Sequence, residues 1–231
     1  MTTPRFTPAA VAFLRALKRH NDREWFKARK EQYDALLRGP MIEVIEQLAR
    51  DFSAFAPDLV ANAKVSLYRI YRDTRFSENK APLKTHIAAV FPCRGLGKHE
   101  GAGLYLEVAP AWVWAGGGMY APDTSQLQAV REHIAGKPRR FRAIVQSRAF
   151  RRDVGPLSGE RLQRVPRGFP RDHEAAEYLK HRQFLAGHEF PASFATSPAF
   201  YRGVLTVFRR VAPLAAFLNE PLLAQARLKH A

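Results

Sequence analysis

The stretch Gly103-Leu-Tyr-Leu-Glu-Val-Ala-Pro-Ala-Trp-Val-Trp-Ala115 decides the fold, because it holds two strand patterns separated by a short turn. Gly103–Val108 and Trp112–Ala115 are rich in apolar, β-branched and aromatic residues, which favour strands. Ala109-Pro110 joins them tightly. Strands joined by so short a connection pair in the antiparallel sense.

Two segments before this hairpin have the same character. Val65–Arg72 and His86–Phe91 are predicted strands, and no helical pattern separates the strand segments. Consecutive strands without an intervening helix predict an antiparallel meander. Gly116-Gly117-Gly118 is predicted to break the sheet, and Arg182–Phe190 is predicted to add a last short strand.

The N-terminal part of the chain has a helical period instead. Apolar residues recur every three to four positions from Val11 to Phe52. Thr7-Pro8 predicts the start of the first helix, and Asn21 or Asp22 predicts the cap of the second. Gly39-Pro40 is predicted to end that second helix, and a third follows it.

Helical patterns return after the predicted sheet, starting at Pro122-Asp123. The segment Val154–Pro170 is rich in glycine and proline and is predicted to be irregular. The further predicted helices are Lys137–Ser147, Arg171–Lys180, Ser197–Leu218, which we expect to be interrupted or kinked at Pro213, and Pro221–Lys229. We therefore expect one α+β domain over residues 1–231, with helices on one face of an antiparallel meander. Its parts are a helical region (8–55), the sheet (64–118) and a mixed helical region (123–231).

Composition excludes several classes of protein. The chain has 231 residues, of which 46% are hydrophobic and 25% are charged, as in ordinary globular proteins. The single cysteine, Cys93, excludes a disulfide framework and a cysteine-based zinc site. No apolar run approaches the ~18 residues that a membrane span needs, and no signal-peptide pattern is present. We expect a cytoplasmic protein with no membrane partner.

The charge of the chain is unusual for a globular domain. Lysine and arginine number 37 against 21 acidic residues, for a net charge of +16, and Lys137–Arg171 alone holds 11 basic and two acidic residues. A basic segment of this kind is typical of proteins that bind polyanions such as nucleic acids. The alternative is a solvated basic surface, because aromatic residues that stack on bases are not interleaved with the arginines.

The densest group of chemically useful side chains lies between the first two predicted strands. Its basic members are Arg69, Arg72, Arg75, Lys80, Lys84 and His86, and the nearby acidic residues are Asp73 and Glu78. A cluster with so few acceptors favours a phosphate or carboxylate ligand. The alternative is a structural arginine network bonded to loop carbonyls. We also expect Arg69 or Arg72 to make a structural pair, with Asp73 or Glu107 as the candidate partners.

His86 is the candidate for proton transfer in this cluster. Its ordinary pKa of ~6.5 suits a general acid or base, and Asp73 is the expected carboxylate that orients it. Lys84 and Thr85 beside it fit a phosphoester site. The histidines show no metal-binding spacing and no cofactor motif is present, so we expect neither a metal nor a cofactor.

Two other segments are candidate walls of the same site. Gly117, Gly118 and Tyr120 follow a predicted strand, and glycines there permit a close approach of the backbone to a ligand. The alternative is a sharp turn from the sheet into a helix. The loop Arg164–Arg171 is stiff and basic, and its Arg167 is either part of an anion cleft or on a surface crossing.

Several motifs together resemble a family of conserved hypothetical proteins, domain of unknown function 2461. The matching segments are Phe13-Leu14, His20–Phe26, Arg69–His86, Gly117–Pro122, Leu127–Ile134, Pro166–Phe169 and Phe217–Asn219. The resemblance covers nearly the whole chain, and Arg131 falls within it and joins the expected ligand-binding residues. Leu83 departs from the pattern, since family members often carry tyrosine there. The resemblance implies no activity, so binding of an anionic small molecule is our leading expectation, with nucleic-acid binding and a protein-interaction domain as alternatives.

Overall fold

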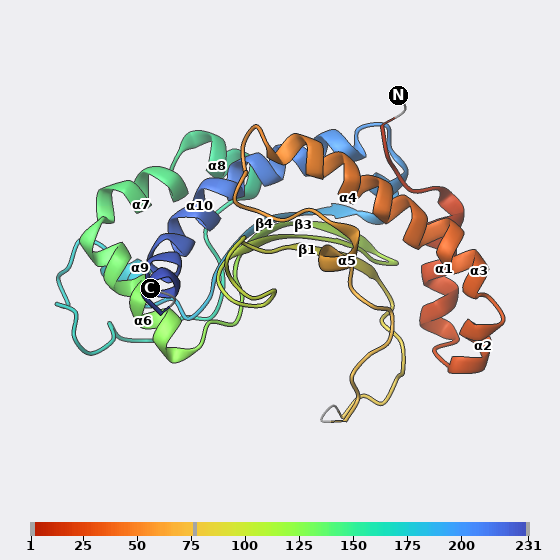
Figure 1. The fold of residues 1–231 in the computed structure, drawn as a ribbon, viewed down its shortest axis with the longest axis horizontal. Helices are drawn as coiled ribbons and strands as arrows, with labels where there is room; N and C mark the ends of the chain where they lie inside the picture. Colours follow the sequence, from red (N-terminus) through yellow and green to blue (C-terminus); the bar gives the residue numbers. More distant parts are fainter. Residues whose placement is uncertain (1–2, 76–77, 230–231) are drawn as a thin grey trace.

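The structure is a computed structural model that describes residues 3–75 and 78–229. Its centre is a four-stranded antiparallel sheet in the order β1-β2-β3-β4, and the long helices lie across one face of this sheet (Figure 1). The strands are β1 (Ile87–Phe91), β2 (Gly103–Val108), β3 (Trp112–Met119) and β4 (Phe184–Pro191). The predicted α+β class and the meander are confirmed.

The helix-covered face holds the core. Helix α10 (Phe200–Lys229) packs on β2, β3 and β4, and α4 (Gly39–Phe52) packs on β1. Leu104, Leu106 and Val108 of β2 are fully buried, whereas Tyr105 and Glu107 between them are only half-buried. Because side chains alternate across a strand, the latter two point to the opposite face, which curves inward and is not covered by the long helices (Figure 1).

The N-terminal helices begin as the sequence predicts but continue differently. The elements are α1 (Pro8–Arg19), α2 (Arg23–Lys27), α3 (Lys30–Tyr33), a π-helical turn (Asp34–Arg38) and α4 (Gly39–Phe52). Thr7 and Asp22 cap α1 and α2 through their side chains. The boundary predicted at Gly39-Pro40 coincides with the start of α4, but no loop separates this helix from the preceding π-helical turn. Pro40 lies in the first turn of α4.

The C-terminal helix is also longer than predicted. Helix α10 runs from Phe200 to Lys229 and includes both Pro213 and Pro221. The expected interruption is absent because Pro213 lies on the exposed side, while Ala212 and Leu214 beside it are buried in the core. Packing of this helix along the sheet outweighs the cost of about 3 kcal/mol for proline in a helix interior.

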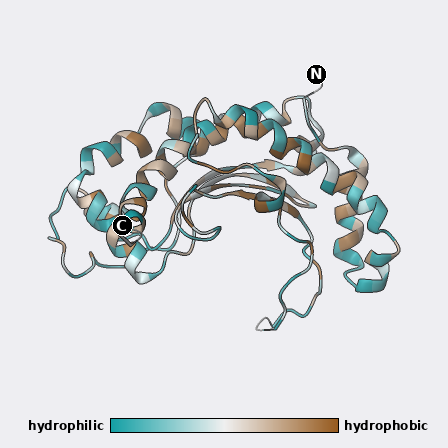
Figure 2. Cartoon of the chain, viewed as in Figure 1, coloured by the Kyte–Doolittle hydropathy of each residue, from teal (hydrophilic) through white to brown (hydrophobic). Residues whose placement is uncertain are grey.

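The segment between β3 and β4 forms the opposite end of the molecule. It contains α6 (Thr124–Gly136), α7 (Pro138–Val145), α8 (Arg148–Val154) and α9 (Ala176–Leu179), and a 3-10 turn (Ala192–Thr196) follows β4. The region between α8 and α9 is irregular, as predicted. Of the predicted helix Arg171–Lys180, only the single turn α9 forms. The helices have hydrophobic residues on one side and hydrophilic residues on the other (Figure 2).

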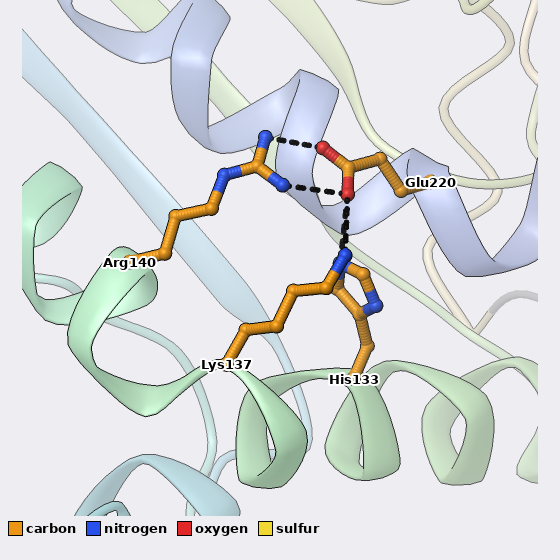
Figure 3. Close-up of polar contacts among 4 residues, drawn as sticks. All are labelled: His133, Lys137, Arg140 and Glu220. Atoms are coloured by element: carbon orange, nitrogen blue, oxygen red, sulfur yellow. Dashed lines mark hydrogen bonds and ion pairs between the residues drawn. The ribbon is translucent and has the colours of Figure 1, made fainter.

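One carboxylate ties α6 and α7 to α10. Glu220 of α10 accepts hydrogen bonds from His133 Nε2 at 3.0 Å, from Lys137 Nζ at 3.4 Å and from the Arg140 guanidinium (Figure 3). His133 belongs to α6, Arg140 to α7, and Lys137 joins these two helices, both of which pack on α10. The cluster therefore fixes this end of the molecule to the helix that covers the sheet.

The predicted strand Val65–Arg72 is not formed. Residues Ala63–Ser66 make the short helix α5, which Asn62 caps, and the buried Ser66 hydroxyl donates to the Val60 carbonyl. The chain beyond it is extended but makes only isolated bridges, Leu67 with Ala89 and Tyr71 with Leu83. The second bridge closes a long loop, which Asn21 holds through two hydrogen bonds to the Leu83 backbone.

The predicted break at Gly116-Gly117-Gly118 is also wrong. All three glycines lie inside β3 and pair with β2 on one side and β4 on the other. A Cβ atom at Gly117 would collide with the Gly103 carbonyl, and one at Gly118 with the Phe184 carbonyl. The glycines are therefore present because the neighbouring backbones lie close, and they continue the sheet rather than end it.

Candidate functional site

A cleft of about 640 Å³ opens on the inward-curving face of the sheet, and we call it the concave cleft. Its volume lies within the range of about 300–1,000 Å³ that is usual for small-molecule sites. The residues that line it come from all four strands, the turn after β3, both ends of the loop before β1, and the β1–β2 connection. The side chains used below are Tyr68, Lys84, His86, Lys98, His99, Tyr105, Glu107, Trp112, Trp114 and Tyr120.

Trp114 lies flat over glycines of β3 and β4. A methyl group at Gly187 would lie 2.5 Å from Trp114 Cζ2, and one at Gly116 would lie 2.6 Å from the far edge of the same indole. The indole therefore rests on a sheet surface that carries no side chains beneath it. Its ring centroid lies 5.8 Å from that of Tyr105, which extends the aromatic surface along β2.

Tyr68 forms a second aromatic wall of the cleft, and two lysine ammonium groups lie against its ring. Lys84 Nζ lies 4.5 Å and Lys98 Nζ 4.7 Å from the centre of the Tyr68 ring, which are cation–π distances. The Tyr68 hydroxyl lies 3.5 Å from His99 Nδ1. Because Lys98 and His99 belong to the β1–β2 connection, this wall joins two segments that are about 30 residues apart.

The two ammonium groups are poorly compensated. Neither Lys84 nor Lys98 lies within 4.0 Å of a carboxylate oxygen among the residues that the structure describes. Partial burial, followed by the charges of Arg69 and Lys98, lowers the pKa of Lys84, and burial lowers that of Lys98. The charge of Glu107 opposes these effects for Lys84. An anion beside the two ammonium groups would stabilise their charged forms further.

Glu107 organises the centre of the cleft. Its Oε2 accepts a hydrogen bond of 2.7 Å from the Tyr105 hydroxyl, and its Oε1 accepts one of 3.0 Å from Trp112 Nε1. His86 Nε2 lies 3.7 Å from Oε2. Since burial raises the pKa of Tyr105, with Glu107 as the next cause, that phenol stays protonated and keeps donating to the carboxylate.

His86 is held in its neutral form. Burial lowers its pKa, and the charges of Lys84 and Arg72 act in the same direction, while Glu107 opposes them. A neutral imidazole next to a carboxylate is suited to accept a proton at neutral pH. The carboxylate beside His86 is therefore that of Glu107. The expected carboxylate, Asp73, pairs with Arg75 instead.

The predicted site residues divide into two groups. Lys84, His86, Gly117, Gly118 and Tyr120 line the concave cleft, and Thr85 lies between the first two in the chain. Arg69 and Arg72 do not line it, but the charge of Arg69 acts on Lys84 and that of Arg72 acts on His86. They belong to its basic surroundings.

The other predicted residues lie elsewhere. Asp73 accepts two hydrogen bonds from the Arg75 guanidinium, of 3.0 and 2.8 Å, which lower the pKa of Asp73 to about 2. Lys80 Nζ donates to the Thr74 carbonyl. The expected convergence of Arg75 and Lys80 with Lys84 and His86 is not found, because the long loop carries the first two away from the sheet.

Two arginines expected at the site are also distant from the cleft lining. Arg131 is buried on α6, where its Nη2 donates to the His181 carbonyl at 3.0 Å. Arg167 is exposed in the irregular segment between α8 and α9. Both therefore belong to the α6–α9 end of the molecule, which the sequence does not place relative to the sheet.

The cleft also contains residues that the sequence did not single out as site residues. These additional lining residues are Tyr68, Lys98, Tyr105, Glu107 and Trp114. The alternation along β2 is the signal that was available, because Tyr105 and Glu107 fall on the face opposite Leu104 and Leu106. Which segments meet that face depends on long-range contacts that no local pattern specifies.

Much of the basic charge outside the cleft is already paired. Within residues 137–171, five of the eleven basic side chains make ion pairs with carboxylates: Lys137, Arg140, Arg142, Arg152 and Arg161. Lys137 and Arg140 share Glu220 (Figure 3). The segment is therefore less electropositive than its composition suggests.

In the described part of the chain, no helix is both long and apolar enough to span a bilayer. The same residues contain no cluster of three or more histidine, cysteine, aspartate or glutamate side chains arranged to hold a metal ion.

Comparison with known proteins identifies the family. The model of the conserved hypothetical protein family DUF2461 matches residues 9–217. The chain belongs to this family. The match begins in α1, ends in α10 and includes every strand that lines the concave cleft. No curated protein and no solved structure matches the chain.

Proposed function

We propose that the concave cleft binds a small anionic molecule, with a phosphorylated compound as the leading class. The observation that carries this proposal is the pair of ammonium groups on Tyr68, which have no carboxylate within 4.0 Å in the described residues. A phosphate or carboxylate between Lys84 and Lys98 accepts charge-assisted hydrogen bonds from both. The size of the cleft and its aromatic walls favour a small molecule over a polymer.

The nucleic-acid alternative has weaker support. Five of the eleven basic side chains in residues 137–171 are paired with carboxylates, which leaves fewer cations for phosphate contacts. The concave cleft is enclosed by the loop arms and the β1–β2 connection, and is unlike a continuous basic stripe. We therefore keep the small anion as the proposed ligand.

Calorimetric titration with inorganic pyrophosphate tests the proposal. Lys84→Met and Lys98→Met keep the apolar stem on Tyr68 but remove the charge. Each loses a charge-assisted bond worth about 1.5–3 kcal/mol, so affinity should fall roughly 10- to 150-fold. Lys18→Met, at an exposed position of α1, is the matched control and should bind as the unmodified protein does. Absence of pyrophosphate binding by the unmodified protein would overturn the proposal.

The stability of the ligand-free variants separates a binding cluster from a structural one. Because Lys84 is repelled by Arg69 and Lys98, Lys84→Met should melt at the same or a higher temperature. A structural lysine would leave its partner unpaired, and its loss would cost about 1–3 kcal/mol. A clear fall in the melting temperature of both lysine variants would assign them to structure.

A second function, phosphoester hydrolysis, is supported by His86 and Glu107. In this reaction His86 accepts a proton from a water molecule while the water oxygen bonds to phosphorus and the ester P–O bond breaks. Glu107 stabilises the imidazolium that forms, and the lysines balance the charge on the phosphate oxygens. The leaving alkoxide or phenoxide takes its proton from solvent or, in the same step, from the imidazolium.

Hydrolysis of 4-nitrophenyl phosphate tests this second function. His86→Asn should lower the rate constant by about 100-fold or more if proton transfer is required, since general base catalysis contributes roughly 10²–10⁴-fold. Asp73→Asn is the matched control, because its carboxylate is paired with Arg75 and outside the cleft lining. Equal rates for the two variants, or no turnover by the unmodified protein, would limit the cleft to binding.

A further inference from the structure

We infer that the ligand of the concave cleft carries a planar aromatic or heteroaromatic ring beside its anionic group, and that this ring stacks on Trp114. The inference rests on the proposed anion site at Lys84 and Lys98 and adds the class of molecule that this site accepts. The geometry that points to it is an indole supported from beneath by glycines and open toward the cleft.

One face of the Trp114 indole is occupied by the sheet itself. Gly116 and Gly187 leave no space for even a methyl group under the ring, so the indole lies against backbone. The residue is nevertheless only half-buried and lines the cleft, so its remaining exposure is on the cleft side. A flat apolar surface exposed at the bottom of a pocket is the arrangement that stacks on a planar ring.

The neighbouring groups hold this surface in one orientation. Tyr105 lies 5.8 Å from the indole centroid, and its hydroxyl is fixed by Glu107 at 2.7 Å. Trp112 Nε1 donates to the same carboxylate. Because hydrogen bonds already order these aromatic side chains, the protein loses little side-chain entropy when a ligand ring stacks on them.

The floor next to the indole is made partly of backbone, although Leu185 of β4 also lines the cleft there. Gly103 of β2 pairs directly with Gly118 of β3, and both glycines line the cleft. A flat group can therefore approach the backbone closely beside Trp114, which a Cβ atom would prevent. The exposed Tyr120 stands at the same end of the cleft and is available as a second aromatic contact.

The anion site and the indole are at a distance suited to one small molecule. Tyr105 lies between them, with ring centroids 6.3 Å from Tyr68 and 5.8 Å from Trp114. An aryl or heteroaryl phosphate that places its phosphate at the lysines extends its ring over this aromatic row. A saturated ring, such as that of a sugar, makes the same ionic contacts but stacks less favourably.

The affinities of phenyl phosphate and cyclohexyl phosphate test the inference, because the two probes differ in the planarity of a ring of the same size. The unmodified protein should bind phenyl phosphate roughly 3- to 10-fold more tightly in calorimetric titrations. Trp114→Phe keeps a ring and should retain the preference, whereas Trp114→Leu should abolish it. Thermal melts of both variants establish that each is folded, and the comparison of probes on the unmodified protein decides the matter if Trp114→Leu does not fold.

The outcomes separate this inference from the proposed function. Equal binding of the two phosphates to the unmodified protein, weakened by Lys84→Met, would overturn the ring inference and leave anion binding in place. Tighter binding of cyclohexyl phosphate would overturn it in favour of a saturated ligand. If neither phosphate binds and pyrophosphate does not bind either, both proposals fail.

Discussion

Glu107 contacts Tyr105, Trp112 and His86 at the candidate site, but no local sequence pattern shows that it lies beside His86. Asp73 is close to His86 in the chain, but Arg75 two positions further on pairs with it locally. Glu107 reaches His86 only through the register of β1 and β2, in which Ala88 pairs with Glu107. The residues 92–102 separate these strands, so their register could not be predicted from a turn type. Local pattern therefore identified the histidine but not its carboxylate.

Replacing Glu107 with glutamine should shift the titration of His86. The carboxylate is the charge that raises the pKa of His86 against burial and the nearby cations. Glu107→Gln keeps the size of the side chain and removes this charge, so the pKa of His86 should fall further below its ordinary value. NMR titration of the imidazole signals measures the change. An unaltered His86 pKa would show that the 3.7 Å approach has no electrostatic consequence.

Three partly buried histidines should make the protein less stable in mild acid. Burial lowers the pKa values of His86, His133 and His181 in the folded protein. The unfolded chain takes up protons at these positions from about pH 6.5 downward, before the folded protein does. The free energy of unfolding should therefore fall as the pH drops from 7.5 to 5.5.

Urea unfolding at these two pH values measures the effect. His181→Gln should reduce the difference, because one of the three histidines no longer contributes. A free energy of unfolding that rises on acidification in this window would contradict the assignment of neutral histidines to the folded protein.

At the scale of elements, local signals predicted helix starts better than strand boundaries. Thr7, Asp22 and Asp123 all cap helices, the last in a full capping box with Gln126. Such caps are local chemistry that a sequence displays directly. Whether Val65–Arg72 joins the sheet depends on a neighbour, and its composition alone could not show that α5 and isolated bridges replace the strand.

The sheet break predicted at the three glycines of β3 is wrong for a related reason. A run of three glycines indicates a turn when only chain flexibility is considered, whereas here each one accommodates an adjacent strand or the Trp114 ring. That crowding is a property of the assembled sheet. It becomes visible only when β4, which lies far along the chain, is placed beside β3.

Adding a methyl group at Gly187 should destabilise the sheet. The new Cβ would lie 2.5 Å from Trp114 Cζ2 and 2.7 Å from the Ala115 carbonyl oxygen, so the indole or the strand must move. We expect Gly187→Ala to lower the free energy of unfolding by about 1–3 kcal/mol and to change the tryptophan fluorescence.

Gly136→Ala is the matched control for this prediction. Nothing lies within 4 Å of the corresponding position at the end of α6, and alanine favours helices over glycine, so this variant should be equally or slightly more stable. Equal stability of the two variants would contradict the close packing of Trp114 on β4.

At the scale of the whole molecule, the two faces of the sheet have different roles. One face is buried under α4 and α10, and the other is the concave cleft with its aromatic and basic lining. The chain has a net charge of +16, and carboxylates such as Glu220 and Glu177 compensate part of the basic charge at the α6–α9 end. The lysines of the cleft, which lie more than 4.0 Å from every carboxylate oxygen of the described residues, are thus distinguished by their surroundings rather than by the overall charge.

Binding at the concave cleft can be measured by NMR titration of the isotope-labelled protein with phenyl phosphate. The largest shifts should occur at Tyr68, Lys84, Lys98 and the Trp114 indole N–H, and they should saturate together with a single dissociation constant. Signals from residues 137–171 should stay in place. Shifts centred on that basic segment, or none at the cleft residues when the probe is saturating for the protein, would contradict the account.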